Sequence, residues 1–370
     1  MTADGPYRVM VVDDSAVIRG LLTRSLESDS AVSVVASVPN GEQAIAGVTR
    51  HDVEVVVLDI EMPVMDGLTA LPKIIAAKRG VQVIMASTLT RKNAEISLRA
   101  LQAGAADYVT KPTSGGDLNS AEEFKRELTQ KVKALGAAVR GSSAPAPRAA
   151  ATAVASGHAS VPRNAGTQFT LRKAPIMPPA AIAIGSSTGG PQALLKVMSD
   201  LGGDLKRPIY ITQHMPATFT TLLAEHITRS TALTCNEAKD GESVSADQAY
   251  LAPGDYHMEV EAGDPAPVIR LNQNPPESFC RPAVDPMLRS LSRLYGSRLL
   301  VVILTGMGAD GAKGSEKVIA AGGTVIAQDE ATSVVWGMPG AVATAGLCSE
   351  VMPIGDIAPY IRKLLMRSAA

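Results

Sequence analysis

Residues 53–60 read Val-Glu-Val-Val-Val-Leu-Asp-Ile, an almost uninterrupted apolar run that ends close to a carboxylate. A β-branched run without alternation is typical of a strand buried on both faces, as in a parallel sheet covered by helices. Similar runs recur between residues 7 and about 133, at 9–12, 32–37, 81–87 and 107–111, with helical patterns between them. The sequence therefore predicts a doubly wound, parallel α/β domain.

A second series of strands begins after Pro179. Apolar runs at residues 181–184, 208–214, 249–253, 298–306 and 324–329 alternate with helical patterns at 191–198, 219–229, 285–295 and 312–321. An antiparallel hairpin is expected around residues 256–271. We therefore expect a second doubly wound α/β domain, Rossmann-like in architecture.

The segment between the two series cannot form a core. Between about residues 136 and 178 the chain is rich in Ala, Ser, Pro and Gly, and Phe169 is its only aromatic residue. Such a composition buries too little apolar surface to offset the entropy of folding, which predicts a flexible linker. The expected organisation is a first domain at 1–135, a linker at 136–178 and a second domain at 179–370.

The composition narrows the class of protein. The 370 residues are 46% hydrophobic with a formal net charge of −1, so nothing favours nonspecific binding to nucleic acid or to an anionic membrane. The three cysteines lie far apart without a CxxC pair, which argues against a disulfide framework or a zinc cluster. Neither a secretory signal nor a run of about 18 apolar residues is found. We expect a cytoplasmic protein without membrane insertion.

Polar residues follow the strands of the first domain. Asp13 and Asp14 follow the first strand, Asp59 the third, Ser87 the fourth and Lys111 the fifth. Carboxyl ends of parallel strands share one edge, where a carboxylate cluster suits Mg²⁺ and a carboxylate can accept a phosphoryl group. A lysine and a serine can bind the phosphate oxygens. The alternative is that Asp13, Asp14 and Ser15 cap the following helix.

This pattern, with Asp-x-x-Met-Pro-x-Met-Asp-Gly at residues 59–67 and Lys-Pro after the fifth strand, resembles the receiver domain of two-component response regulators. The resemblance covers residues 7 to about 127 and implies a flavodoxin-like fold. It also implies phosphoryl transfer from a histidine kinase to Asp59. The implied Mg²⁺ ligands are Asp13, Asp14 and Asp59, the implied phosphate contacts are Ser87 and Lys111, and the implied aromatic switch is Tyr108.

A Gly-rich turn follows the first strand of the second domain. Residues 185–189 read Gly-Ser-Ser-Thr-Gly and fit G-x-S-x-G, with Ser187 at the centre and Pro191 in the first helical turn. Such a turn projects a serine nucleophile at a helix N-terminus, where N–H groups can stabilise an oxyanion. A plain turn and a phosphate cradle are alternatives, and the phosphate cradle loses support because G-x-G-x-x-G and a P-loop lysine are missing.

A nucleophilic serine needs a base and a group that orients it. His214 directly follows the strand at 208–214, whereas the other histidines occupy helical, linker or alternating-strand contexts. Asp310 lies in a Gly-rich turn after the strand at 298–306, where capping of the next helix is its alternative role. Because all three residues follow buried strands of one parallel sheet, they predict a Ser-His-Asp triad. Their order in the chain differs from that of α/β-hydrolases.

The motifs IGSSTGGP, ITQHMP, LAPGDYHM, LTGMGADG and VWGMPGAV resemble, in order, the catalytic domain of the chemotaxis response regulators that act as protein-glutamate methylesterases. The resemblance implies hydrolysis of glutamate methyl esters on chemoreceptors, and often deamidation of receptor glutamines. It implies Ser187 as nucleophile, His214 as base, Asp310 as its partner, and Met307 and Thr188 beside the site, with the Met307 N–H in the oxyanion hole. Ser186 stands where the family more often has alanine.

The two resemblances together predict the partners and the regulation. The expected partners are cytoplasmic domains of methylated chemoreceptors and a chemotaxis histidine kinase, with recruitment to membrane receptor arrays left open. Mg²⁺ is expected for phosphorylation and no cofactor for ester hydrolysis. The unmodified receiver is expected to limit access to Ser187. Alternatives are a different serine hydrolase, a nucleotide-binding output or a DNA-binding output, and the last would require a basic helix-turn-helix that the sequence lacks.

Overall fold

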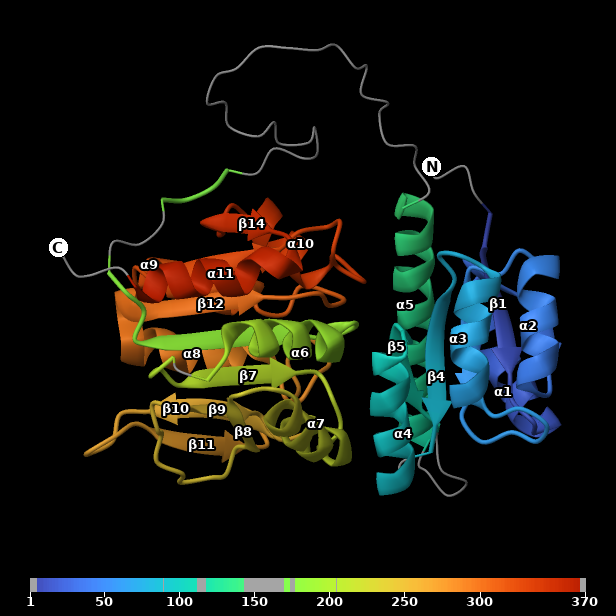
Figure 1. Cartoon of the computed structure of the whole chain (residues 1–370), viewed down its shortest axis with the longest axis horizontal. Coiled ribbons are helices and arrows are strands. Elements are labelled where there is room, and N and C mark those ends of the chain that lie inside the picture. The colour runs from blue at the N-terminus through green and yellow to red at the C-terminus, as the bar shows by residue number, and fades with distance from the viewer. Residues whose placement is uncertain are drawn as a thin grey trace, which may run out of the picture.

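The structure is a computed structural model of the chain and describes residues 5–88, 90–111, 118–142, 170–173, 177–203 and 205–366. Its elements form two α/β domains, each built around one parallel sheet, as the sequence predicts (Figure 1). Within these residues, no helix has the length and apolar character needed to span a bilayer.

The first domain has a five-stranded parallel sheet in the order β2-β1-β3-β4-β5, which is the flavodoxin-like order. Its buried strands carry the predicted apolar runs. The strands are β1 (Tyr7–Val12), β2 (Val32–Val38), β3 (Val55–Asp59), β4 (Gln82–Ser87) and β5 (Asp107–Thr110). The helices are α1 (Ala16–Glu27), α2 (Gly41–Arg50), α3 (Gly67–Ala77), α4 (Arg91–Gln102) and α5 (Leu118–Ser142).

The second domain has a seven-stranded parallel sheet in the order β14-β13-β12-β6-β7-β9-β8. These strands are β6 (Ala181–Ser186), β7 (Ile209–Gln213), β8 (Thr234–Glu237), β9 (Gln248–Leu251), β12 (Leu299–Ile303), β13 (Thr324–Gln328) and β14 (Glu350–Met352). The expected antiparallel hairpin is formed by β10 (His257–Glu261) and β11 (Val268–Asn272).

Helices cover both faces of this second sheet. They are α6 (Gly190–Leu201), α7 (Ala217–Ser230), α8 (Val284–Tyr295), α9 (Ala312–Ala320), α10 (Met338–Thr344) and α11 (Ile354–Leu365), with a short 3₁₀ turn at Gly296–Arg298. The strand order reverses at β6, because the chain leaves β6 towards β7 on one side and later returns to β12 on the other. In open α/β sheets such a reversal is where ligands bind.

Residues of both domains that the structure describes extend into the expected linker. Helix α5 continues to Ser142, beyond the boundary expected at residue 135. Leu171 packs against the second core, and the Arg172 N–H donates to the Cys348 carbonyl at 2.9 Å. The remainder of the expected linker, residues 143–169 and 174–176, lies outside the described residues.

The two domains pack against each other. Figure 1 shows α4, β5 and α5 on the side of the first domain that faces α6, α7 and the carboxyl ends of the second sheet. Tyr108 of β5 stacks on Phe219 of α7, with ring centroids 4.2 Å apart and planes at 7°. The Gln192 side-chain amide of α6 donates to the carbonyls of Leu101 and Ala105, each at 2.6 Å. These contacts bring the edge of the first domain to the rim where Ser187 lies.

Candidate functional sites at the carboxyl edges of the two sheets

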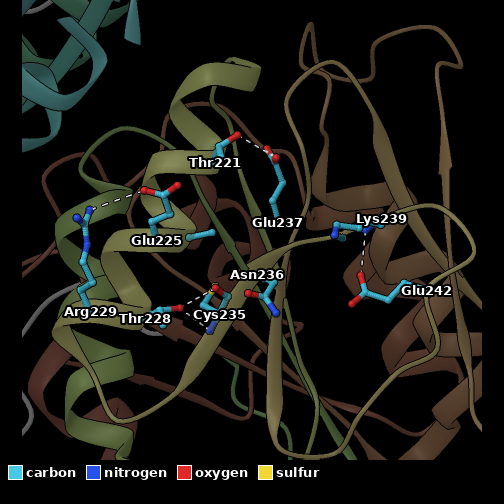
Figure 2. Close-up of a pocket in the computed structure, with 11 residues that line it drawn as sticks. Thr221, Glu225, Thr228, Arg229, Cys235, Asn236, Glu237, Lys239 and Glu242 are labelled. Carbon is cyan, nitrogen blue, oxygen red and sulfur yellow. Dashed lines mark hydrogen bonds and ion pairs between the residues drawn. The ribbon is translucent and has the colours of Figure 1, made fainter. Parts of the chain in front are cut away.

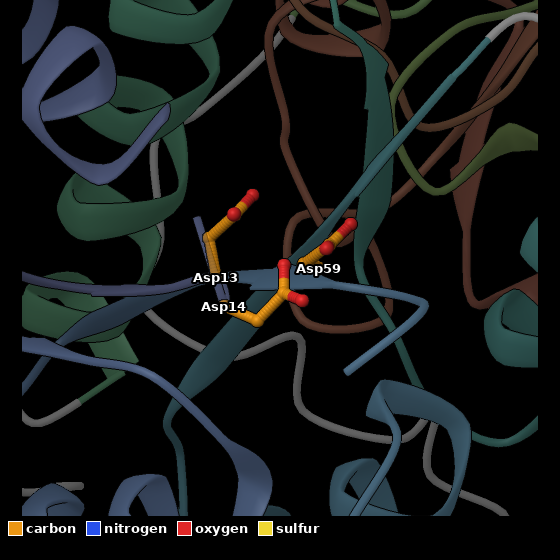
Figure 3. Close-up of side chains that lie close together, drawn as sticks. All are labelled: Asp13, Asp14 and Asp59. Carbon is orange, nitrogen blue, oxygen red and sulfur yellow. The ribbon is translucent and has the colours of Figure 1, made fainter. Parts of the chain in front are cut away.

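The first site lies where β1 and β3 end. Asp13 and Asp14 follow β1, Asp59 ends β3, and ligand oxygens of the three carboxylates lie within 4.8 Å of one another (Figure 3). Hard oxygen ligands at this spacing fit Mg²⁺. Helix α1 is capped instead by Ser15, whose hydroxyl accepts a 3.4 Å hydrogen bond from the Ile18 N–H. The capping alternative is therefore confirmed for Ser15 and wrong for Asp13 and Asp14.

Lys111 and Ser87 complete this edge. The Lys111 Nζ lies 2.5 Å from Asp13 Oδ2 and 2.5 Å from Asp59 Oδ1. Burial, together with the nearby Asp13 charge, raises the pKa of Asp59 above its usual value, although the charge and hydrogen bond of Lys111 lower it. Ser87 is buried at the end of β4, where its hydroxyl accepts a 3.3 Å hydrogen bond from Ser97. An acceptor carboxylate, a cation and a hydroxyl thus lie together, as phosphoryl binding requires.

Glycine is required immediately beside this carboxylate. A Cβ at Gly67 would lie 2.0 Å from the Asp59 carbonyl oxygen, which no other residue can tolerate. The Gly67 N–H donates to the Ile60 carbonyl at 2.9 Å, and Asp66 caps α3 by accepting from the Thr69 N–H at 2.7 Å. Asp66 and Gly67, which end the motif at residues 59–67, therefore fix the conformation of the loop that follows β3.

The second site begins with two serines in different surroundings. Ser186 is buried at the end of β6 and its hydroxyl donates to Gln213 Oε1 at 2.7 Å. Ser187 is half-buried, and its carbonyl accepts from the Gln213 side chain at 2.9 Å and from the Gly190 N–H at 2.7 Å. The Ser187 hydroxyl has no hydrogen-bond partner among the described residues. Ser187 is therefore the serine whose hydroxyl remains for chemistry.

His214 and Asp310 form a hydrogen-bonded pair beside this serine. Residues Ser186 and Gln213 are register partners of β6 and β7, so Ser187 and His214 leave adjacent strands at the same level. The His214 Nε2 lies 2.7 Å from Asp310 Oδ2. Ser187 and His214 are not themselves hydrogen-bonded in the described structure. Such hydrogen bonds are often long without substrate and tighten only in the complex.

Asp310 is buried where α8 begins. Its carboxylate accepts from the N–H groups of Val284 at 2.6 Å and Asp285 at 3.1 Å. Burial would raise the pKa of Asp310, but His214 and these N–H donors hold it below the usual value. Asp310 thus caps α8, whereas its position in the sequence suggested capping of α9. The carboxylate is fixed and charged, as a partner that orients an imidazole must be.

Cys280 contacts the other ring nitrogen of His214, and sequence analysis missed it. Its Sγ lies 3.3 Å from His214 Nδ1. Burial lowers the pKa of His214, but the Cys280 sulfur and the Asp310 carboxylate outweigh it and raise the pKa to about 10. Because Nε2 faces Asp310, Nδ1 is the nitrogen that remains to accept a proton. A cysteine in an irregular loop, with no motif around it, gives no sequence signal of this contact.

Met307 and Thr188 lie on either side of Ser187. A Cβ at Gly306 would lie 2.9 Å from the Ser187 Cβ, so the backbone that leads into Met307 passes directly against the serine. The half-buried Met307 side chain packs against a core cluster that contains first-domain residues and Val335 of the second domain. Thr188 is buried, and its hydroxyl donates to Asp107 Oδ2 of β5 at 2.7 Å. Both residues therefore connect the Ser187 rim to the other domain.

Known proteins match both domains. Residues 9–122 match the family described as response regulator receiver domain, and residues 182–361 match the family described as CheB methylesterase. A "Protein-glutamate methylesterase/protein-glutamine glutaminase of group 2 operon" from Rhodospirillum centenum is 58% identical over 99% of this chain and 95% of its own length. The chain belongs to the protein-glutamate methylesterase/protein-glutamine glutaminase family.

Other methylesterases of the family are similarly close. The "Protein-glutamate methylesterase/protein-glutamine glutaminase 1" of Paramagnetospirillum magneticum is 58% identical over 99% of this chain and 98% of its own length. The solved catalytic domain of Thermotoga maritima CheB methylesterase is 41% identical, with a TM-score of 0.49, and covers 50% of this chain and 98% of that chain. In this chain a receiver precedes the hydrolase domain.

A groove elsewhere on the methylesterase domain is separate from this chemistry. Figure 2 shows its lining side chains, which come from α7, the edge strand β8 and the loop that follows β8. Its volume is about 570 Å³. Its polar side chains pair with one another, as Thr221 does with Glu237 at 2.9 Å. The residues that line it do not include Ser187, His214 or Asp310. The groove therefore offers no candidate for the ester-binding site.

Proposed function

We propose that the chain hydrolyses glutamate methyl esters on chemoreceptors, and deamidates receptor glutamines, through Ser187, His214 and Asp310. The hydrogen bond between His214 and Asp310, one strand away from an uncommitted Ser187 hydroxyl, carries the proposal. The substrates would be cytoplasmic receptor domains, and recruitment to membrane receptor arrays would bring the enzyme to them.

The chemistry follows from the placement of the three groups. Ser187 Oγ attacks the ester carbonyl while His214 takes the hydroxyl proton at Nδ1, and Asp310 stabilises the imidazolium. Backbone N–H groups at the start of α6 and at Met307 would stabilise the oxyanion. His214 then gives the proton to the leaving methoxide, and methanol departs. Water hydrolyses the glutamyl-enzyme by the reverse proton transfers, and with a glutamine substrate the leaving group is ammonia.

The receiver would take its phosphoryl group from a chemotaxis histidine kinase at Asp59. Asp13, Asp14 and Asp59 would hold Mg²⁺, which when bound neutralises charge on the phosphoryl oxygens. Lys111 and Ser87 would bind those oxygens after phosphorylation. Lys111 contacts Asp59, and Ser87 ends β4, the strand that pairs with β3. Both side chains would therefore exchange their present hydrogen bonds for phosphoryl oxygens when Asp59 is phosphorylated.

Receiver docking would limit access to the ester-binding site. The Thr188–Asp107 hydrogen bond and the Tyr108–Phe219 stack both join β5 to the Ser187 side of the other domain. Phosphorylation of Asp59 would weaken this contact through Tyr108, the proposed aromatic switch. A complete population switch requires about 5.5 kcal/mol, whereas one phosphate adds one to three strong hydrogen bonds. We therefore expect partial release.

The nucleophile is tested by methanol release from a methylated receptor fragment. Ser187→Ala should lose at least about a thousandfold in turnover, as removal of a triad serine does. Ser186→Ala is the matched control, because Ser186 is buried on Gln213, and it should stay within about tenfold of wild type. A Ser187→Ala enzyme that keeps more than about a thousandth of wild-type turnover would overturn the assignment. Ester hydrolysis without methanol release from receptor would instead indicate another serine hydrolase.

Occlusion is tested by deleting the receiver. We place the first domain boundary after Ser142, where α5 ends, so the deletion should remove residues 1–142. The shortened chain should hydrolyse methylated receptor faster than the unphosphorylated full chain. Equal or lower activity in a folded product would contradict inhibition by occlusion.

A further inference from the structure

The turn at residues 277–280 stands beside His214 and carries an aromatic ring into solvent. Glu277 and Cys280 exchange two backbone hydrogen bonds of 3.1 and 2.9 Å, and Cys280 contacts His214 Nδ1. Between them, Ser278 and Phe279 have φ angles of 51° and 63°. Phe279 is 74% exposed. Phe279 therefore directly precedes Cys280, the residue that contacts the proposed base His214.

This conformation is unfavourable for the residues that adopt it. Two-residue turns with both central residues at positive φ normally contain Asn and Gly. This backbone region is unfavourable for residues other than Gly, and outliers of this kind cluster at functional sites. Arg289 holds the turn by a bidentate ion pair with Glu277, with contacts of 2.8 and 2.5 Å. The exposed Phe279 ring adds nothing to the core of its own domain. We therefore expect a partner outside that domain to account for this unfavourable backbone conformation.

A cation covers this ring in the structure. The guanidinium carbon of Arg126, on α5 of the receiver, lies 4.4 Å from the Phe279 ring centroid. The ring face therefore accepts a basic side chain at the distance of a cation–π contact. When the receiver moves away, as the proposed regulation requires, the ring face that Arg126 occupies becomes available to a substrate that enters the same rim.

We propose that Phe279 is a substrate-recognition residue that binds an arginine or lysine side chain of the receptor segment carrying the esterified glutamate. The inference rests on the proposed function. A basic side chain on this ring lies close to His214 along the turn, so it would hold the ester near Ser187. A cation–π contact of about 0.5–2 kcal/mol corresponds to about 2- to 30-fold in KM.

The test separates protein recognition from ester chemistry. With a saturating phosphoryl donor, Phe279→Ala should raise KM for the methylated receptor fragment by about 2- to 30-fold and keep kcat within about twofold. Its hydrolysis of N-acetylglutamate γ-methyl ester should equal that of wild type, because this probe has no basic side chain. Phe279→Trp should restore the low KM. Replacing the basic residues beside the receptor glutamate with glutamine should raise KM for wild type but not for Phe279→Ala.

Two further variants distinguish substrate recognition from domain docking and from backbone strain. Arg126→Ala removes the same contact between the domains and keeps the ring, so its KM under phosphorylation should equal that of wild type. Phe279→Asn keeps a residue that tolerates positive φ, and it should show the KM of Phe279→Ala. Unchanged KM in both Phe279 variants would overturn the inference while leaving methanol release by wild type as support for the proposed function. Equal KM increases in Arg126→Ala and Phe279→Ala would also overturn it, because the ring would then serve only domain docking.

Discussion

Replacing Tyr108 with alanine should activate the unphosphorylated enzyme. Its ring stacks on Phe219 across the interface with centroids 4.2 Å apart, and both side chains are buried. A buried aromatic pair contributes about 0.5–1.5 kcal/mol beyond the area that it buries. Loss of about 1–1.4 kcal/mol from the closed state increases the ratio of open to closed molecules about five- to tenfold. Basal hydrolysis should rise by the same factor if most molecules are closed.

The assay is the initial rate of methanol release from a methylated receptor fragment without phosphoryl donor. Tyr108→Phe keeps the stacked ring and is the matched control, so its rate should remain near wild type. With a saturating donor the three proteins should converge, because all of them are then largely open. A folded Tyr108→Ala enzyme with a wild-type basal rate and a full response to the donor would show that this stack does not hold the closed state.

Four other predictions have distinct readouts. Asp59→Asn should abolish stimulation by phosphoryl donors and leave basal hydrolysis unchanged, measured by methanol release with and without donor. Because His214 must be unprotonated to act and its pKa is raised, kcat/KM for a small ester should increase with pH and reach half its maximum above the ordinary imidazole value of about 6.5. Asp310→Asn should move the His214 titration, followed by NMR, to lower pH; an unchanged or higher midpoint would refute the role of the carboxylate. Ser186→Ala should lower the free energy of unfolding by about 1 kcal/mol because Gln213 Oε1 loses its buried donor, and unchanged denaturant midpoints would show that this bond is not stabilising.

The sequence was sufficient for all strands of the first sheet, for the interior strands of the second sheet, and for the residues that follow them at the carboxyl ends. Continuous apolar runs identify buried parallel strands, and a residue directly after such a run must emerge at one edge, which is how Asp59, His214 and Asp310 could be placed. Strands β8 and β14 were missed because they are short edge strands without a continuous apolar run. Edge strands are half solvated, so burial leaves little pattern in their sequence.

Contacts between loops that are distant in sequence could not be predicted from the sequence. The choice between Ser186 and Ser187 depends on Gln213, whose side chain reaches the turn from the neighbouring strand. Cys280 meets His214 only because an irregular turn returns to the rim. These relations depend on side-chain direction across elements far apart in sequence, which neither periodicity nor local motifs encode.

The hydrogen bonds of Gln192 to the first domain affect how freely the sequences of the two domains can change during evolution. The Gln192 side-chain amide donates hydrogen bonds to the main-chain carbonyls of Leu101 and Ala105, and not to their side chains. Any substitution at those two positions that preserves the backbone conformation leaves both hydrogen bonds intact. Homologous receivers could therefore be exchanged onto this hydrolase with little loss of fit at that point, provided that the bend between α4 and β5 keeps its shape.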